Sequence, residues 1–252
     1  VVLLLSFFFV YTIVIVIKQK KLSDIKTDFI NNMTHELKTP ISTISLSSKV
    51  INNPNIINQP ERLSRYASII EEENLRLKNQ VEKVLQISFF ERQDIQLNIG
   101  SFDVKLLVEA AIKPFEIILE EKNGTINLIG ESFDVELDEN YFSNVISNLI
   151  DNAIKYAGET SPEINVSIEK NEKRFILKIS DNGIGMKTEE LKNIFNKFYR
   201  VPTGNVHNVK GFGIGLSYVQ LMVEKHGGSI KVNSQIGQGT QFTIVLPLKQ
   251  KS

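Results

Sequence analysis

The chain begins with an almost wholly apolar stretch that ends abruptly at a basic cluster. Residues 1–17 are rich in Val, Leu, Ile and Phe, and Lys18, Lys20 and Lys21 follow directly. As a helix this stretch would be roughly 26 Å long, near the hydrocarbon thickness of about 30 Å, and basic residues mark the cytoplasmic flank of membrane helices. A signal peptide fits less well, because no small-residue cleavage site follows. The pattern predicts a transmembrane helix over residues 1–17, with residues 18–252 in the cytoplasm.

The polar sequence after this cluster has the pattern of two helices joined by a turn. Apolar residues at three- and four-residue spacing predict helices over about 22–51 and 61–91, and the Asn- and Pro-rich segment between them predicts a turn. In the second helix these residues alternate steps of four and three, the a/d pattern of coiled coils, with Asn74 as a polar member. Two such helices leave apolar seams uncovered. We therefore expect an all-α domain over residues 18–95 that dimerises into a four-helix bundle.

From residue 98 to the end, short alternating strands are mixed with amphipathic helices. Because the strands mostly follow one another without an intervening helix, we expect an antiparallel or mixed sheet with helices on one face. This α/β two-layer sandwich would occupy residues 98–252, about 150 residues, which is enough for one independent core. The expected strands are 125–129, 164–169, 175–180, 229–233 and 241–247, and the expected helices are 104–121, 141–157 and 214–225.

Composition narrows the possible functions. The chain has 252 residues, with 29 basic and 29 acidic side chains, so no global field favours nucleic acid as a partner. The absence of cysteine excludes a disulfide scaffold, a thiolate metal site and a cysteine nucleophile. Three widely spaced histidines do not indicate zinc. Because the chain begins with valine, we expect it to be the C-terminal part of a longer protein.

One histidine lies off the apolar face of its helix. Met33, Leu37 and their neighbours form a buried stripe, and His35 lies about 200° around the helix from each of these two residues. His35 should therefore face solvent or a partner, with Thr39 one turn on and Glu36 beside it. An imidazole is largely an uncharged nucleophile near neutral pH, and a neighbouring carboxylate can accept its proton. Alone, His35 would be interpreted as a surface residue without a role.

A second polar pattern runs along the expected helix 141–157. Asn144, Asn148 and Asn152 recur at four-residue steps beside two apolar rows, although asparagine is a poor residue for the middle of a helix. Three amides in register predict a site, since amide oxygens suit Mg²⁺, and Lys155 would lie near phosphates. An exposed polar face without function is the alternative.

Two glycine-rich segments follow. Residues 181–185, Asp-Asn-Gly-Ile-Gly, come after a strand, so the carboxylate can accept a hydrogen bond from an amino group of a flat ligand that the glycines let approach. Residues 210–216, Lys-Gly-Phe-Gly-Ile-Gly-Leu, lead into a helix whose N-terminal amides can bind phosphate. Between them, the polar residues 202–209 predict a mobile lid, and Arg200 could reach a terminal phosphate.

In their order, these motifs resemble those of the membrane-bound sensor histidine kinases of bacterial two-component systems, over nearly the whole chain. Residues 29–40 are similar to the phosphoacceptor box of that family. The other boxes that match are the asparagine box at 148–156, the first glycine box at 181–186, the phenylalanine box at 195–200, the second glycine box at 211–216 and the third at 237–240.

The resemblance implies a function for the helical domain. His35 would be autophosphorylated from ATP, with Glu36 as its acid/base partner, and would pass the phosphoryl group to an aspartate of a separate response regulator. Thr39 would position the water for a regulator phosphatase activity. The protein would be a homodimer in the bacterial inner (cytoplasmic) membrane, and His226, at a helix end, would be structural.

The resemblance also implies a site for ATP and Mg²⁺ in the α/β domain. Asn152 would bind Mg²⁺ with Asn148 beside it, and Tyr156 would lie against the adenine. Asp181 would accept a hydrogen bond from the adenine amino group. The remaining contacts would come from Lys155, Gly183, Gly185, Arg200, Lys210, Gly211, Gly213, Gly215, Leu216 and Thr240, with the glycines at 211–215 as the hinge of the lid.

Two other functions fit parts of the pattern. An ATP hydrolase like the gyrase-type relatives would need a carboxylate to activate water, but the matching position is Asn148, whose amide cannot be a general base. The other alternative is a non-catalytic membrane scaffold or a protein that acts mainly as a phosphatase. The intact nucleotide boxes argue against the scaffold, whereas Thr39 is compatible with both kinase and phosphatase activity.

Overall fold

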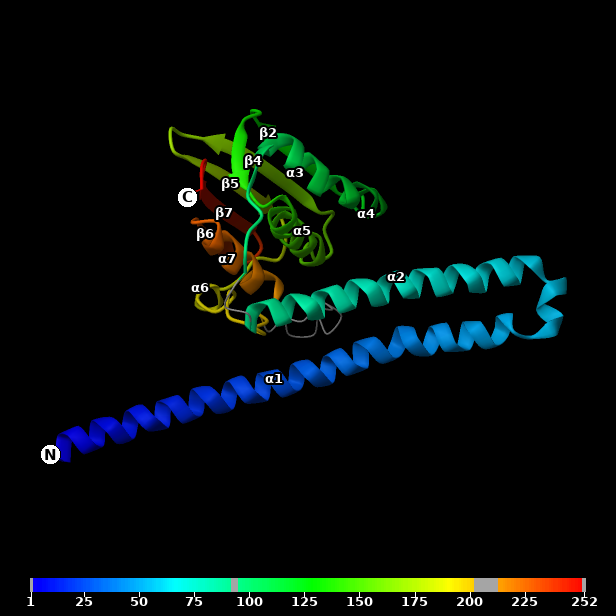
Figure 1. Cartoon of the computed structure of the whole chain (residues 1–252), viewed down its shortest axis with the longest axis horizontal. Coiled ribbons are helices and arrows are strands. Elements are labelled where there is room, and N and C mark those ends of the chain that lie inside the picture. Colours follow the sequence, from blue (N-terminus) through cyan, green and yellow to red (C-terminus); the bar gives the residue numbers. More distant parts are fainter. Residues whose placement is uncertain (1, 92–94, 202–212, 251–252) are drawn as a thin grey trace. The chain divides into compact units, whose positions relative to one another are not determined.

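The computed structural model describes residues 2–91, 95–201 and 213–250 of the chain (Figure 1). The chain divides into two compact units, Val1–Arg92 and Gln93–Ser252. The described part of the first unit is helical, and the second unit combines helices with two sheets.

The helical unit is a hairpin of two long helices. α1 (Val2–Ile51) and α2 (Pro60–Glu91) are joined by the short 3₁₀ helix η1 (Pro54–Asn58). Asn53 caps η1, because its side-chain oxygen accepts a hydrogen bond from the backbone N–H of Asn55 at 3.0 Å. The predicted helical hairpin is confirmed, although α1 runs without a break through the basic cluster.

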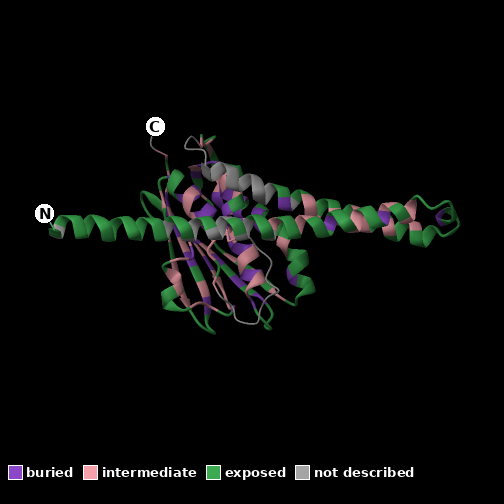
Figure 2. Cartoon of the chain, turned by 90° about the horizontal axis from the view of Figure 1, so that it is seen from below, coloured by how far each residue is buried: buried purple, intermediate pink, exposed green. Residues whose placement is uncertain are grey.

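The transmembrane helix expected over residues 1–17 is not found. Within the described part of the chain, no helix is both long enough and apolar enough to cross a membrane. The apolar stretch is the first part of α1 and ends at Ile17. Its side chains are exposed in the chain, Phe7 to 70% and Phe9 to 68% (Figure 2).

Within a single chain, the a and d residues of α2 form two sets, one half-buried and one exposed. Ile70 and Leu77 are half-buried in the hairpin, whereas Ala67, Asn74 and Val81 are exposed. Alternate a and d positions lie on different sides of a helix seam, so a two-helix hairpin covers only one set. Asn74 therefore lies outside the core of the single hairpin.

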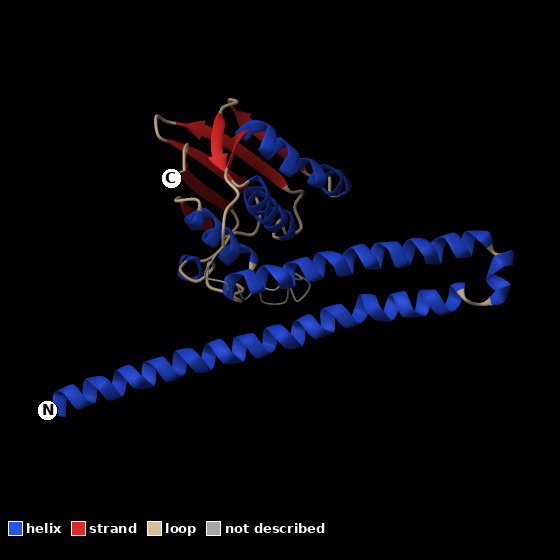
Figure 3. Ribbon diagram, viewed as in Figure 1, coloured by secondary structure: helices blue, strands red, loops and turns tan. Residues whose placement is uncertain are grey.

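The α/β unit is built on a five-stranded sheet in the order β2-β4-β5-β7-β6. Figure 3 draws its strands in red and the helices beside them in blue. β2 pairs with β4 in parallel, and the other neighbours are antiparallel, which confirms the mixed sheet. The strands are β2 (Thr125–Gly130), β4 (Glu163–Lys170), β5 (Arg174–Asp181), β6 (Ser229–Gln235) and β7 (Gly239–Pro247).

The helices of this unit cover one face of the sheet. Burial alternates along β4 and β5, which places successive side chains on a covered and an open face. On the covered face, Phe175 packs edge-on against Phe142 with the ring centroids 5.8 Å apart, and both side chains are fully buried. The helices are α3 (Val104–Ile112), α4 (Glu116–Glu121), α5 (Glu139–Lys155), α6 (Thr188–Leu191) and α7 (Gly215–Lys225).

Two local features differ from the expectation. β1 (Gly100–Asp103) and β3 (Asp134–Leu137) form a separate antiparallel pair, and at four residues each they are too short for periodicity to reveal. The helix expected over 104–121 is interrupted by the 3₁₀ helix η2 (Lys113–Phe115). Pro114 causes this interruption, because it has no backbone N–H with which to continue the α-helix.

A buried histidine links the end of α7 to the start of α5. His226 is fully buried, its Nε2 accepts a hydrogen bond from the backbone N–H of Asp138 at 3.0 Å, and its Nδ1 lies 2.7 Å from the carbonyl oxygen of Met222. A carbonyl only accepts, so Nδ1 carries the proton and the ring is neutral. The Asp138 carboxylate in turn accepts hydrogen bonds from the backbone of Tyr141 and Asn98, which fixes the start of α5.

This burial makes the stability of the α/β unit depend on pH. Desolvation lowers the pKa of His226 below its ordinary value of about 6.5, so the unfolded chain binds more protons than the folded chain as the pH falls. The stabilisation is complete above about pH 6.5 and is lost below it. We expect the free energy of unfolding, measured by denaturant titration, to decrease from pH 7.5 to pH 5.5.

The variant His226→Gln should unfold more easily, by about 1–3 kcal/mol at pH 7.5, because buried hydrogen-bonding groups lose their partner. Its free energy of unfolding should also depend less on pH than that of the parent chain. The matched control is His35→Gln, which removes an exposed histidine and should leave the pH dependence unchanged. Equal slopes in the parent and in His226→Gln would contradict this account.

Candidate functional site

The carboxylate of Asp181 organises the end of the central strand. Asp181 is the last residue of β5 and pairs in register with Thr240 of β7. Its Oδ1 accepts hydrogen bonds from the backbone N–H of Gly183 at 2.9 Å and of Thr240 at 3.1 Å. Burial raises the pKa of this carboxyl, and the two backbone hydrogen bonds oppose the shift. The half-buried Asp181 carboxylate is therefore held in a fixed direction at the end of the central strand.

The side chain of the neighbouring Asn182 stabilises the fold through hydrogen bonds to the backbone. Its side-chain oxygen accepts a hydrogen bond from the backbone N–H of Glu163 at 2.9 Å, and its amide nitrogen donates to the Ser161 carbonyl at 3.0 Å. Both contacts hold the beginning of β4. The hydrogen-bond partners therefore distinguish the two residues: Asn182 stabilises the start of β4, whereas Asp181 binds the backbone around the glycines.

Glycines allow three backbone segments to meet around Asp181. A Cβ on Gly183 would overlap the carbonyl oxygen of Tyr156. Gly185 has a left-handed backbone, φ +66°, and a Cβ there would overlap the Gln235 carbonyl. Gly239, at φ +86°, lies against the backbone of Asp181 itself. Sequence reasoning did not single out Gly239, although it lies within the third glycine box.

The side chain of Ser234 connects the loop after β5 to the start of β7. Ser234 of β6 accepts a hydrogen bond from the backbone N–H of Met186 at 2.9 Å and donates to the carbonyl of Gly239 at 2.8 Å. Its hydroxyl also lies 2.9 Å from the hydroxyl of Thr240. Ser234 was not among the predicted site residues, because a lone serine in an alternating strand has no sequence signal.

The amide stripe of α5 lies next to the start of α7. Asn148 and Asn152 are half-buried, one helical turn apart. The amide nitrogen of Asn148 donates to the Asn144 carbonyl at 2.8 Å, and a Cβ on Gly215 would lie 2.8 Å from the Asn148 side-chain oxygen. The oxygen of Asn148 therefore faces the backbone at which α7 begins.

The cationic and aromatic residues at the end of α5 have partners of their own. Lys155 forms an ion pair with Asp151 on the same helix. Burial raises the pKa of the Tyr156 phenol, while the nearby charge of Arg200 lowers it. The carbonyl of Tyr156 accepts a hydrogen bond from Ile184 N–H at 2.9 Å, which joins α5 to the loop after β5.

The second glycine segment is described only in part. Gly213 has a left-handed backbone, φ +67°, and its carbonyl accepts a hydrogen bond from the N–H of Phe198 at 2.8 Å. Gly215 and Leu216 are the first residues of α7, the latter half-buried. Lys210, Gly211 and the expected lid over 202–209, with His207, lie outside the described residues.

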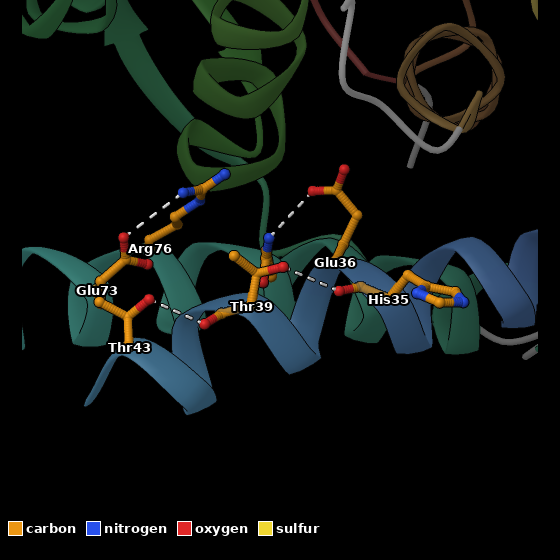
Figure 4. A network of polar contacts seen from close by, with 7 residues as sticks. His35, Glu36, Thr39, Thr43, Glu73 and Arg76 are labelled. Carbon is orange, nitrogen blue, oxygen red and sulfur yellow. Dashed lines mark hydrogen bonds and ion pairs between the residues drawn. The ribbon is translucent and has the colours of Figure 1, made fainter. Parts of the chain in front are cut away.

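In the helical unit, His35 is exposed on α1, as helix geometry predicts (Figure 4). Thr39 is also exposed, and its hydroxyl donates to the His35 carbonyl at 3.4 Å. Glu36 is half-buried, and its Oε2 accepts a hydrogen bond from Nε2 of Gln80, a residue of α2 that is only 7% exposed. Gln80 therefore fixes the carboxylate of the residue that follows the histidine, a role that no spacing pattern revealed.

Metal-binding clusters were also sought. Among the residues that the structure describes, no group of three or more His, Cys, Asp or Glu side chains could hold a metal ion. One hard oxygen ligand close to the second glycine segment is the amide oxygen of Asn148 on α5, which lies near Gly215.

Two family models match the chain. Residues 25–93 match the His Kinase A (phospho-acceptor) domain, and residues 137–250 match the Histidine kinase-, DNA gyrase B-, and HSP90-like ATPase. Together they define a phosphoacceptor hairpin followed by an ATP-binding unit, which is the domain arrangement of a histidine kinase.

Individual proteins are similar over nearly the whole chain. Sensor protein RprX of Bacteroides fragilis is 46% identical over 251 residues, which are 98% of this chain and 48% of the relative. Sensor histidine kinase WalK of Bacillus subtilis is 31% identical over 244 residues, 94% of this chain and 39% of the relative. The solved structure of the Acinetobacter baumannii histidine kinase AdeS is 28% identical, with a TM-score of 0.61, over 85% of this chain and 98% of that one.

The chain spans about half or less of the length of these two curated relatives. It belongs to the sensor histidine kinases of two-component signalling.

The glycine packing around Asp181 leads to a prediction. Gly185→Ala should weaken ADP binding about tenfold or more, because the added Cβ forces the loop away from Gln235 and overpacking costs about 1–3 kcal/mol. Isothermal titration calorimetry measures the effect. The matched control is Gly237→Ala, which also has a left-handed backbone, φ +74°, but has nothing within 4 Å of its Cβ position. If both variants weaken binding equally, close packing at residue 185 is not the cause.

Proposed function

We propose that this chain is an ATP-dependent protein-histidine kinase that phosphorylates His35 and then transfers the phosphoryl group to an aspartate of a separate response regulator. The observation that carries the proposal is the exposed imidazole of His35, followed in the sequence by Glu36, whose carboxylate Gln80 holds in place. The α/β unit of the same chain supplies a half-buried acceptor, Asp181, among close-packed glycines. A phosphoryl acceptor and a nucleotide site are the two requirements of one transfer reaction.

In this proposal the adenine base lies at the end of β5. Its amino group donates to Asp181, whose direction is fixed by the backbone N–H groups of Gly183 and Thr240. The half-buried ring of Tyr156 offers an aromatic face to the planar base. Gly183 and Gly185 keep the backbone close enough for this contact.

The phosphates and Mg²⁺ are assigned to the amide stripe and the start of α7. Asn152 would hold the ion through its amide oxygen, with Asn148 beside it. Because the Asn148 amide nitrogen donates to the Asn144 carbonyl, the Asn148 oxygen is the atom that is left to face the ion or its water shell. Bound Mg²⁺ would neutralise charge on the phosphoryl group during transfer.

Cations and backbone amides would complete the phosphate site. The backbone N–H groups of Gly215 and Leu216 would suit an anion, because the first turn of α7 leaves such groups without a partner inside the helix. Lys155 would stay close to the phosphates while its charge is shared with Asp151. Arg200, Lys210 and the lid glycines Gly211 and Gly213 are assigned to the same site.

The transfer step would be an in-line displacement. A nitrogen lone pair of neutral His35 attacks the γ-phosphorus, a P–N bond forms, the bond to the bridging oxygen breaks, and ADP leaves. The imidazole proton passes to Glu36, which lies on the same helix turn. Positioning and charge stabilisation would supply most of the rate enhancement.

Two properties of the whole protein are part of the proposal. The exposed side chains of Ala67, Asn74 and Val81 suit the face at which a second chain completes a four-helix bundle, with Asn74 setting the register. The exposed apolar residues at the start of α1, followed by the basic cluster, suit the bacterial inner membrane with the remainder in the cytoplasm. Analytical ultracentrifugation and cell fractionation measure these two properties.

The acceptor residue is tested by substitution. His35→Gln should lose more than about 95% of the label transferred from γ-labelled ATP, because an amide cannot attack phosphorus. ATP binding, measured by calorimetry, should be unchanged, since residue 35 lies on the other unit. The label on the parent chain should be lost in acid. Label that persists in His35→Gln, or that survives acid as a serine ester would, contradicts the proposal.

The phosphatase activity has its own test. Thr39→Ala should slow dephosphorylation of the regulator about tenfold or more, because the hydroxyl that would orient the water is removed, while autophosphorylation should fall far less. The matched control is Thr43→Ala, one turn further on, whose hydroxyl makes the same type of bond to the carbonyl of Thr39 at 3.1 Å. Equal loss of phosphatase activity in both variants argues against a specific role for Thr39.

A further inference from the structure

Ser234, on β6, contacts both the loop after β5 and the start of β7, the two segments that bind the Asp181 carboxylate. It accepts from Met186 N–H at 2.9 Å, donates to the Gly239 carbonyl at 2.8 Å, and lies 2.9 Å from the Thr240 hydroxyl oxygen. Met186 belongs to the loop after β5, and Gly239 and Thr240 are the first two residues of β7. The hydroxyl is half-buried, so its own hydrogen-bond geometry is set by protein groups.

The protons in this cluster can be assigned. A hydroxyl has one proton and two lone pairs. A carbonyl oxygen can only accept, so the Ser234 proton points to Gly239. A backbone N–H can only donate, so Met186 occupies one lone pair of Ser234. The contact with Thr240 must then be a donation from the Thr240 hydroxyl into the remaining lone pair of Ser234.

This assignment determines what Thr240 can offer to a ligand. Its single hydroxyl proton is used by Ser234, so its oxygen keeps only acceptor capacity. The Oδ1 atom of Asp181, to which the backbone N–H of Thr240 donates at 3.1 Å, is likewise an acceptor. Two neighbouring side chains therefore present acceptors and no donor. Such a pair favours an exocyclic amino group on a purine and disfavours a carbonyl oxygen at that position.

We propose that Ser234 is a positioning residue that fixes the Thr240 hydroxyl as an acceptor and thereby makes the nucleotide site selective for a 6-amino purine. The inference rests on the proposed nucleotide-binding function. Ser234 acts through Thr240 and does not touch the base itself.

The test compares two nucleotides that differ in one group. Dissociation constants for ATP and for purine riboside triphosphate, which lacks the 6-amino group, are measured by calorimetry for the parent chain and for Ser234→Ala. We expect Ser234→Ala to weaken ATP binding about fivefold to tenfold, the value of one hydrogen bond, and to change the binding of the second nucleotide less than about twofold. A purely structural loss would weaken both nucleotides by the same factor.

Two further variants keep the result interpretable. Ser234→Thr retains the hydroxyl and should restore the preference for ATP. Ser229→Ala makes the same chemical change at an exposed position of the same strand and should leave both constants unchanged. In a Thr240→Val background, Ser234→Ala should have no further effect on the ratio of the two constants, because the group it positions is already absent.

Each outcome is decisive. Equal weakening of both nucleotides in Ser234→Ala, or an unchanged ratio, overturns the inference while leaving the proposed function intact. A parent chain that binds neither nucleotide overturns the proposed function and the inference with it. If Ser234→Ala does not fold, the ratio in Ser234→Thr decides, since a preference below that of the parent chain contradicts positioning by the hydroxyl.

Discussion

The hydrogen bonds to the Asp181 carboxylate are the interaction on which the α/β unit's site depends. One oxygen, Oδ1, receives the N–H groups of Gly183 and Thr240 and so joins the end of β5, the following loop and the start of β7. Close approach of these segments is possible because residues 183, 185 and 239 have no side chain. Ser234 adds a second set of bonds across the same junction. The burial that raises the pKa of Asp181 follows from this packing.

The helical unit meets a different physical requirement. A phosphoryl acceptor, the role proposed for His35, has to be accessible; His35 is exposed, whereas the adjacent Glu36 is half-buried and bonded to Gln80. One residue is thus free to be reached and its neighbour is held in place. In the proposed function, the α/β unit would bind the nucleotide at fixed backbone groups, and the helical unit presents an exposed imidazole on a helix.

Much of this could be predicted from local patterns. The exposure of His35 follows from 100° per residue, and the mixed sheet follows from strands without intervening helices. The bonds of His226 and Ser234 could not be predicted, because their partners lie far away in the sequence: Asp138 is 88 residues from His226, and Met186 is 48 residues from Ser234. The ion pair of Lys155 with Asp151 was at the right spacing, but the interpretation of Lys155 as a phosphate ligand took precedence over it. The predicted membrane helix was not found in the described part of the chain, where the apolar stretch is the first part of the longer helix α1.

The most direct test of the central claim, that the Asp181 junction is the nucleotide site, is a titration of the ¹⁵N-labelled chain with ADP and Mg²⁺ followed by amide NMR. The account predicts that the largest shift changes include the amides of Gly183 and Thr240, which are bonded to the carboxylate that would meet the base. It also predicts that the amides around Asn53, in the turn of the helical hairpin, do not change. Binding that leaves Gly183 and Thr240 unchanged while shifting amides elsewhere would contradict the account.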